Sequence, residues 1–161
     1  MIVRLLAATL LTAALPAAAQ SVPSANFSDM WWNPAESGWG ISLVQHAPSN
    51  KVYAVWYTYD PREQDPANGQ FKPLWFVMDG GTWTTPNTLT GPAYVTNGVP
   101  FSQAGSATTV TRAGTFTFTF TSSGAGTFRY DIAPPAGVPS TDPAFNLPAF
   151  SGTKSIVRQS F

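Results

Sequence analysis

The stretch TFTFTFT, residues 115 to 121, alternates threonine and phenylalanine without interruption. Successive side chains of a β-strand point to opposite faces, so the three phenylalanines share one face and the four threonines share the other. Residues 122–126 then read SSGAG, which favours a turn, and residues 128–132 repeat the alternation. The two runs predict a β-hairpin with one buried face and one solvated face.

Further short apolar and aromatic runs lie on both sides of this hairpin, separated by Gly, Pro and Asn. No stretch keeps a 3.6-residue period, so no long helix is expected. About eight strands with hairpin-length links are typical of an antiparallel meander, and a C-terminal strand tied beside an early one would close it. We therefore expect an all-β fold, a closed or nearly closed barrel, with a two-sheet β-sandwich as the alternative. Beyond the hairpin, the expected strands are residues 39–46, 52–59, 73–79, 88–96, 106–112 and 153–161.

Two segments do not fit a strand. Residues 20–28 are expected to form a flexible lead-in, which leaves residues 29–161 as a single β-domain. Residues 133–148 contain five prolines, which lack the N–H that a central strand needs, so a surface loop is expected there.

The loop at residues 60–72 carries acidic and amide side chains that favour oxygen-liganded cations such as calcium. Its spacing matches no EF-hand, an arginine lies among the acids, and Asp and Asn are common turn formers. We expect a solvated hairpin loop and no metal site.

The N-terminus has the pattern of a secretory signal peptide. Arg4 supplies the positive charge, residues 5–15 form an apolar run too short to span a bilayer, and residues 17–19 give a small-residue cleavage site. Residues 1–19 are therefore expected to be removed, with an uncleaved membrane anchor as the alternative. No second apolar run follows, so we expect an exported chain in the periplasm, at the cell surface or outside the cell, without a transmembrane segment.

The charge and the rare residue types exclude several functions. Once Arg4 is removed, seven basic residues face eight acidic ones, which argues against binding nucleic acid or anionic lipid. The chain has no cysteine and one histidine, which excludes thiol chemistry and a histidine-rich zinc site. It also has no phosphate-binding loop, dinucleotide fingerprint or HExxH motif, so no cofactor is expected.

Tryptophan and tyrosine are concentrated before residue 84, and the later part of the chain relies on phenylalanine. Both residue types combine a large apolar ring with a polar group, which suits a surface that stacks on a sugar or a small apolar ligand. Within residues 52–59, the tyrosines share the face opposite Trp56, and the adjacent Trp31 and Trp32 must point to opposite sides of an extended chain. The alternative is that these aromatic residues are simply core. The candidate ligand-binding residues are Trp31, Trp32, Trp39, Tyr53, Tyr57 and Tyr59.

The segment from Asn33 to Gly40 also predicts a local structural motif. Asn33 is a favoured N-cap, Pro34 fits the first position of a helical turn, and Glu36 completes a variant of the capping box. Gly38 and Gly40 are then expected to end the turn, so that the next strand begins at Trp39. On this interpretation Glu36 stabilises backbone N–H groups and has no chemical role.

The alternative role for Glu36 is that of an acid or base near His46 in a hydrolase. The nucleophile motif G-x-S-x-G is absent, and Glu36 with Asp79 is the one carboxylate pair worth testing for glycosidase chemistry. We therefore favour an exported, non-enzymatic binding or envelope-associated module. A structural or protein-interaction domain is the second hypothesis, and a hydrolase using Glu36 or His46 is the third.

Residues 31–40, WWNPAESGWG, resemble the opening of a family of secreted or surface β-domains in proteobacteria that is recognised by a WWNPxESGWG segment. Three further features match: the Tyr59-Asp60 step, the K-P-L-W run at residues 72–75, and the closing K-x-I-x-R-Q-x-F pattern at residues 154–161. The resemblance implies an exported domain but no particular activity. Residues 61–71 replace a short turn of the family pattern, so nothing about that loop carries over.

Overall fold

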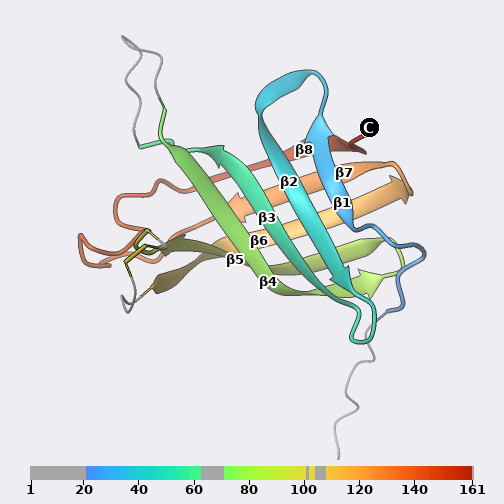
Figure 1. Cartoon of the computed structure of the whole chain (residues 1–161), viewed down its shortest axis with the longest axis horizontal. Helices are drawn as coiled ribbons and strands as arrows, with labels where there is room; N and C mark the ends of the chain where they lie inside the picture. The colour runs from blue at the N-terminus through green and yellow to red at the C-terminus, as the bar shows by residue number, and fades with distance from the viewer. Residues whose placement is uncertain (1–20, 63–70, 101, 104–107, 161) are drawn as a thin grey trace, which may run out of the picture.

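The computed structural model describes residues 21–62, 71–100, 102–103 and 108–160 and shows a closed, eight-stranded antiparallel β-barrel (Figure 1). The expected meander barrel is therefore confirmed, and the sandwich alternative is not. The predicted signal peptide and most of the loop before β4 lie outside the described residues. The described chain contains no helix that is long and apolar enough to span a bilayer. The strands are β1 (Asp29–Asn33), β2 (Glu36–His46), β3 (Lys51–Tyr59), β4 (Pro73–Thr85), β5 (Thr88–Asn97), β6 (Thr109–Ser122), β7 (Ala125–Ile132) and β8 (Phe150–Arg158).

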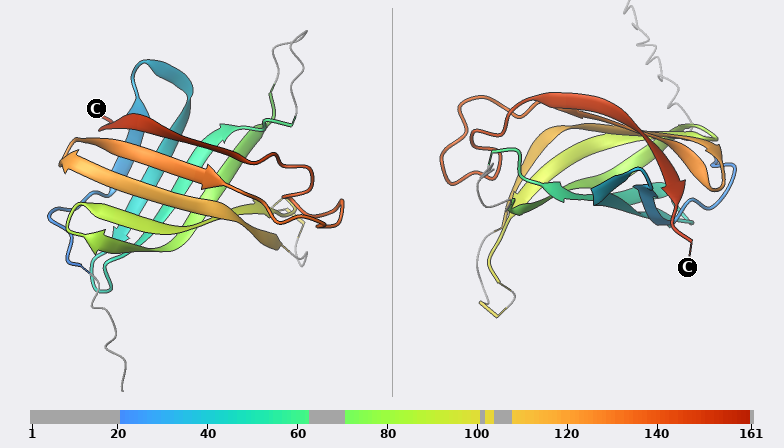
Figure 2. Two further views of the ribbon diagram at one scale, coloured as in Figure 1. Left: turned by 180° about the vertical axis from the view of Figure 1, so that it is seen from behind. Right: turned by 90° about the horizontal axis from the view of Figure 1, so that it is seen from above.

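Each strand pairs with the next in chain order, and β1 closes the barrel against β8. This closure is short, because Trp31 pairs with Arg158, Trp32 pairs with Val157, and β1 then ends at Asn33. Strands β1 to β4 form one layer, called here the front layer, and β5 to β8 form the back layer. The two layers cross at a large angle, and the β1–β2 hairpin extends beyond β8 (Figures 1 and 2).

The core follows the alternation that the sequence predicts. Phe116, Phe118 and Phe120 of β6 are all buried, whereas the threonines between them face outward or lie at the barrel rim. Trp56 joins the same core from β3, in contact with Phe76 and Phe116. Large rings therefore fill the interior without any disulfide.

The number of strands agrees with the expected eight, but two assignments change. β1 was not expected as a strand, because its two tryptophans interrupt any simple alternation. Residues 109–112 of the expected strand 106–112 and the expected strand 115–121 instead belong to one strand, β6, and residues 106–107 lie outside the described residues. β6 continues through Ala113 and Gly114 with a shift of register against β5.

The described part of the lead-in, from Ser21 to β1, contacts the barrel. Ser21 and Ser24 donate backbone hydrogen bonds to the carbonyl oxygens of Trp83 and Pro86 at the β4–β5 turn. Phe27 is buried and stacks on Phe120, with 4.0 Å between ring centroids. Burial of this ring favours the contact of the segment with the barrel.

The proline-rich segment between β7 and β8 is a loop, as expected, and it covers one end of the barrel. Ala144 and Leu147 are buried within the core cluster. The hydroxyl of Thr111 donates to the Asp142 carboxylate at 2.7 Å, and the Arg62 guanidinium donates to the carbonyl oxygen of Pro143 at 2.9 Å. These contacts fix the loop to β6 and to the end of β3.

Gly114 provides a test of how closely β6 and β7 approach. A Cβ atom at this position would meet the backbone carbonyl of Asp131, whereas a Cβ atom at Gly124, in the β6–β7 turn, would have nothing within 4 Å. We expect Gly114→Ala to lower the free energy of unfolding by about 1–3 kcal/mol, because the backbone of β7 must move. Gly124→Ala is the matched control and should be close to neutral. Urea denaturation measures both, and equal midpoints would contradict this description of the β6–β7 contact.

Candidate functional site

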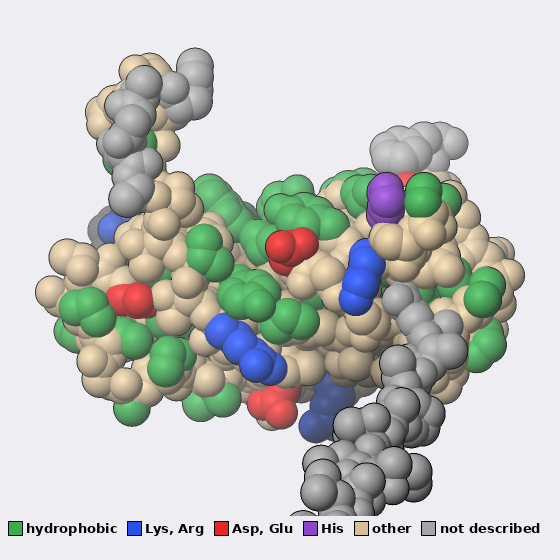
Figure 3. All heavy atoms as spheres, turned by 90° about the horizontal axis from the view of Figure 1, so that it is seen from below, with side chains coloured by type: hydrophobic (Ala, Val, Ile, Leu, Met, Phe, Trp, Pro, Cys, Tyr) green, Lys and Arg blue, Asp and Glu red, His purple; other side chains and the backbone are tan. Residues whose placement is uncertain are grey.

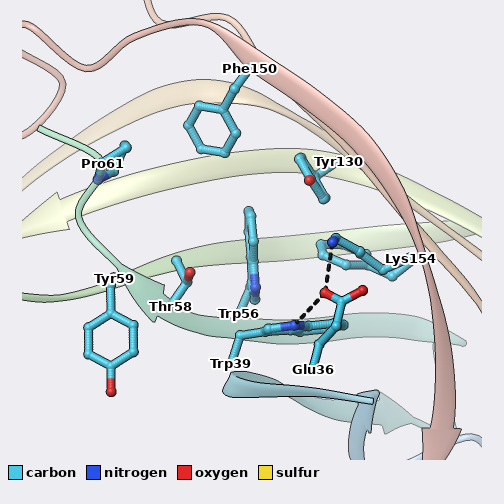
Figure 4. A pocket seen from close by; sticks show the side chains of 10 residues that line it. Glu36, Trp39, Trp56, Thr58, Tyr59, Pro61, Tyr130, Phe150 and Lys154 are labelled. Carbon is cyan, nitrogen blue, oxygen red and sulfur yellow. Dashed lines mark hydrogen bonds and ion pairs between the residues drawn. The ribbon is translucent and has the colours of Figure 1, made fainter. Parts of the chain in front are cut away.

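A half-open pocket of about 280 Å³ lies where the start of β2 and the end of β3 face β7 and β8 (Figure 4). Its lining combines aromatic rings with one ion pair. Strand alternation directs Trp56 of β3, Tyr130 of β7 and the two β8 side chains toward the barrel interior. On β2, Glu36 and Trp39 are three positions apart with the positive-φ Gly38 between them, so alternation alone does not place both side chains here. The principal lining residues are Glu36, Trp39, Trp56, Tyr130, Phe150 and Lys154.

The pocket has a rigid aromatic floor. Trp56 stacks on Tyr130 with 4.8 Å between ring centroids and makes an edge contact with Phe128 at 5.3 Å. Phe150 lies near both, 6.3 Å from the ring of Trp56 and 5.9 Å from that of Tyr130. Trp56 is 7% exposed. Its ring is therefore packed in the core, and the exposed part of it lines the pocket.

Glu36 is the polar centre of the pocket. Its carboxylate accepts hydrogen bonds from Asn33 Nδ2 at 3.2 Å and from Trp39 Nε1 at 3.2 Å. Lys154 Nζ donates to Oε2 of the same group at 2.7 Å and forms an ion pair with it (Figure 4). This ion pair links the front layer to β8, two elements that do not pair through their backbones at this point.

The ion pair shifts the pKa values of the two groups in opposite directions. The hydrogen bond from Lys154, supported by that from Trp39, lowers the pKa of Glu36 below its ordinary value. The same hydrogen bond raises the pKa of Lys154. The resulting stabilisation is complete above the ordinary pKa of glutamate and is lost as the pH falls through the lowered value. At the alkaline end it is complete below the ordinary pKa of lysine and is lost as the pH rises through the raised value.

The role of Glu36 differs from the capping box expected. Pro34 and Ala35 form a two-residue β-turn between β1 and β2, and Asn33 pairs with Glu36 across it. Asn33 Oδ1 accepts a hydrogen bond from the Ala35 N–H, so the asparagine does organise the turn. The chain reverses into a strand and not into a helical turn, which points the Glu36 side chain into the pocket. Gly38 has φ +93°, as expected for a left-handed residue.

The adjacent tryptophans point to opposite sides of β1, as expected. Trp31 is fully buried, and its indole N–H donates to the Phe27 carbonyl oxygen at 3.0 Å. It is therefore a core residue and not part of a ligand surface. Trp32 is half-buried on the other side and does not line the pocket, whereas Trp39 does.

The three tyrosines of β3 lie on the outer face of the barrel. Tyr53, Tyr57 and Tyr59 are 45%, 45% and 50% exposed. Tyr57 pairs with Trp75 of β4, which is 48% exposed, and with Gly40 of β2 on its other side. Figure 4 shows that the ring of Tyr59 points away from the pocket, although the residue lies at its rim. Of the six predicted ligand residues, Trp39 thus lies in the inner pocket and the three tyrosines form an outer row, whereas Trp31 and Trp32 belong to neither.

The residues proposed for hydrolysis do not come together. Glu36 begins β2 and His46 ends it, ten residues and roughly 33 Å apart along an extended strand. Asp79 lies with His46 beside the β2–β3 turn, also far from Glu36. The pKa of Glu36 lies below its ordinary value, so the carboxylate is ionised at neutral pH and has no proton to give as a general acid.

The described part of the acidic loop also has a structural role. Asp60 is buried, and Arg62 forms an ion pair with its carboxylate at 2.6 Å. Burial alone would raise the pKa of Asp60, but the hydrogen bonds from Arg62 lower it overall. No group of three or more potential metal-binding side chains occurs among the described residues.

Of the six principal pocket residues, the sequence did not identify four: Trp56, Tyr130, Phe150 and Lys154. The alternation in β3 and β7 placed Trp56 and Tyr130 on inner faces, but it did not show that the barrel opens beside them. The signal for Lys154 was weaker still, because its partner Glu36 lies 118 positions away. Only the crossing of the two layers brings them together.

Charged side chains are sparse on the described surface. The face seen from below in Figure 3 carries them singly, separated by polar and hydrophobic side chains.

No family model, curated protein or solved structure matches the chain. The support for the candidate site therefore comes from the geometry of the pocket alone.

The ion pair predicts a measurable titration. Replacing Lys154 with Met removes the main hydrogen bond that lowers the pKa of Glu36, so we expect this pKa to rise, as followed by carbon-13 NMR of the carboxyl group. Lys51→Met, at the far end of β3, is the control and should leave it unchanged. An unaltered Glu36 titration in Lys154→Met would show that the ion pair does not form in solution.

Proposed function

We propose that this chain is an exported binding module and that the pocket receives an apolar group carrying a hydrogen-bonding or charged end. The observation that supports this most directly is the convergence of Trp39, Trp56, Tyr130 and Phe150 on one opening that also contains the Glu36–Lys154 ion pair. Binding pockets combine mostly apolar walls with a few polar groups that orient the ligand. The predicted signal peptide supports export.

The size of the pocket limits the bound group. Its volume of about 280 Å³ lies near the lower end, about 300 Å³, of pockets that hold drug-sized molecules. A single ring system or a short branched chain fits better than an extended lipid. The ring would lie against the Trp56 and Tyr130 floor, where aromatic contacts favour stacked or edge arrangements.

The ion pair can exchange its partners for a ligand. The side chains of Glu36 and Lys154 are 37% and 36% exposed. Because solvent screens an ion pair at this exposure, the pair contributes little to stability. A ligand carboxylate can thus take Lys154 as its partner, and a ligand amine can take Glu36. Asn33 and Trp39 continue to hold the glutamate in place meanwhile.

Small aromatic probes test this function. We expect benzoate, benzylamine and indole to bind, as detected by chemical-shift changes at the pocket residues, and we expect Trp39→Ala and Phe150→Ala to weaken binding about tenfold or more because each removes a wall of the pocket. Trp75→Ala, on the outer face, is the matched control and should keep the affinity.

Two outcomes would contradict the proposal. One is that none of the three probes shifts a pocket resonance at millimolar concentration. The other is that Trp75→Ala weakens binding as much as the pocket variants do, which would place the ligand on the outer face.

A carbohydrate is the second candidate ligand, favoured by the outer row of Tyr53, Tyr57, Tyr59 and Trp75. Gly40 lies opposite Tyr57, and a Cβ atom at Gly38 would come within 3.3 Å of the Tyr59 ring, so the two glycines leave these rings uncovered on the β2 side. An exposed patch of large rings on a monomer is unusual and often marks a binding surface. Rings with polar hydroxyl or indole groups suit the C–H faces and hydroxyls of sugars.

The outer row has its own test. We expect the double variant Tyr57→Ala/Trp75→Ala to lose retention on polysaccharide gels in affinity electrophoresis, while Trp39→Ala in the pocket retains it. If no polysaccharide retards the unmodified protein, the carbohydrate candidate fails and the pocket proposal is unaffected.

A further inference from the structure

β8 has one paired edge and one edge that is largely unpaired. It pairs with β7 along its length, from Phe150 opposite Ile132 to Val157 opposite Ala125, without a bulge. On its other side it pairs with β1 only at Val157 and Arg158. The remaining part of that edge lies beside the mouth of the pocket, since Phe150 and Lys154 both line it.

The hydrogen-bond pattern identifies which backbone groups face this edge. The Arg158 N–H donates to Gly124 on the β7 side at 2.9 Å, and the Gln159 N–H donates to Met30 on the β1 side at 2.8 Å. Successive residues of a strand direct their N–H and C=O groups to alternate sides. The backbone groups of Ser151, Thr153 and Ser155 therefore point away from β7.

These three residues are exposed, and none of their backbone groups has a hydrogen-bond partner among the described residues. Proteins usually protect such an edge with a proline, an outward lysine or a bulge. Residues 150–155, FSGTKS, contain none of these, because Lys154 turns inward to Glu36. The edge is thus open to a further strand.

The front layer extends past this edge. Figures 1 and 2 show the β1–β2 hairpin reaching beyond β8, so that the back layer does not cover the whole hairpin. A strand added to β8 would lie about 4.8 Å further along, over the mouth of the pocket. Its alternate side chains would point in the same direction as Phe150 and Lys154, which is into the pocket.

We propose that the edge of β8 at residues 151–155 binds an extended peptide segment of a partner protein by strand addition, with one apolar side chain of that segment filling the aromatic pocket. This deepens the function proposed above and rests on it for the role of the pocket. Backbone hydrogen bonds to Ser151, Thr153 and Ser155 supply the affinity, and the pocket selects the side chain. A charged residue two positions away in the peptide meets Glu36 or Lys154.

A single extended segment fits this edge better than a second copy of the chain. Two copies joined through their β8 edges would each bring a β1–β2 hairpin on the same side of the joined sheet. Each hairpin extends past its own β8 (Figure 2), so the front layers of both copies would have to fit side by side across the new strand pair. A peptide carries no such second layer.

The experiment uses a phage-displayed library of random linear heptapeptides, selected on the whole mature chain, followed by calorimetry with the selected peptides. Thr153→Pro removes one N–H from the free edge and no hydrogen bond to β7, and edge strands tolerate proline. We expect it to weaken peptide binding about tenfold or more, because the proline also obstructs pairing on that side. Thr153→Ala keeps the N–H and is the matched control, with affinity unchanged.

A second measurement leaves the protein unaltered, in case Thr153→Pro does not fold. The selected peptide is N-methylated at every second residue, in the two possible phases. Strand addition predicts that one phase abolishes binding and that the other preserves it. Equal effects of the two phases, or equal affinities of Thr153→Pro and Thr153→Ala, would overturn the proposal.

The remaining outcomes separate this proposal from the function of the pocket. If small aromatic probes bind the pocket and no peptide is selected, strand addition fails and the pocket proposal stands. If peptides bind in a manner sensitive to Thr153→Pro but insensitive to Trp39→Ala, the edge is a binding site and the pocket is not. Self-association of the chain that Thr153→Pro abolishes would make the occupant a second copy and overturn the peptide proposal.

Discussion

The closure of the barrel between β1 and β8 is the constraint on which the rest of the structure depends. It consists of two residue pairs, and other contacts reinforce it. Trp31 is fully buried, and the Arg158 guanidinium lies 5.3 Å from the centre of its ring, a cation–π contact. Asp29 forms an ion pair with the same guanidinium at 3.5 Å. A single corner of the molecule thus holds the first and last strands together without a disulfide.

The same short closure accounts for the pocket. Because β1 ends at Asn33 while β8 continues back to Phe150, the front and back layers separate, and the inner faces of β2 and β3 are left partly uncovered. The Glu36–Lys154 ion pair spans this separation through side chains alone. A barrel closed along the full length of β8 would have buried these groups among further core rings. The pocket is therefore a consequence of the short closure between β1 and β8.

Much of this fold can be predicted from the local pattern of apolar and polar residues. The Thr–Phe alternation of β6, the outward tyrosines of β3 and the opposed Trp31 and Trp32 follow from the two-residue period of a strand. The Asn33–Glu36 segment was misassigned, because Asn and Pro favour a helical N-terminus and a tight β-turn alike. Lys154 could not be assigned to the site at all, since its contact with Glu36 depends on the angle between two layers, which no local spacing records.

Amide hydrogen exchange along β8, followed residue by residue with NMR, tests most directly whether the barrel stops closing there. We expect an alternation in the free protein: Gly152, Lys154 and Ile156 are protected by their bonds to β7, whereas Ser151, Thr153 and Ser155 exchange rapidly. Uniform protection from residue 151 to residue 156 would contradict it, because the edge would then be paired and the pocket covered.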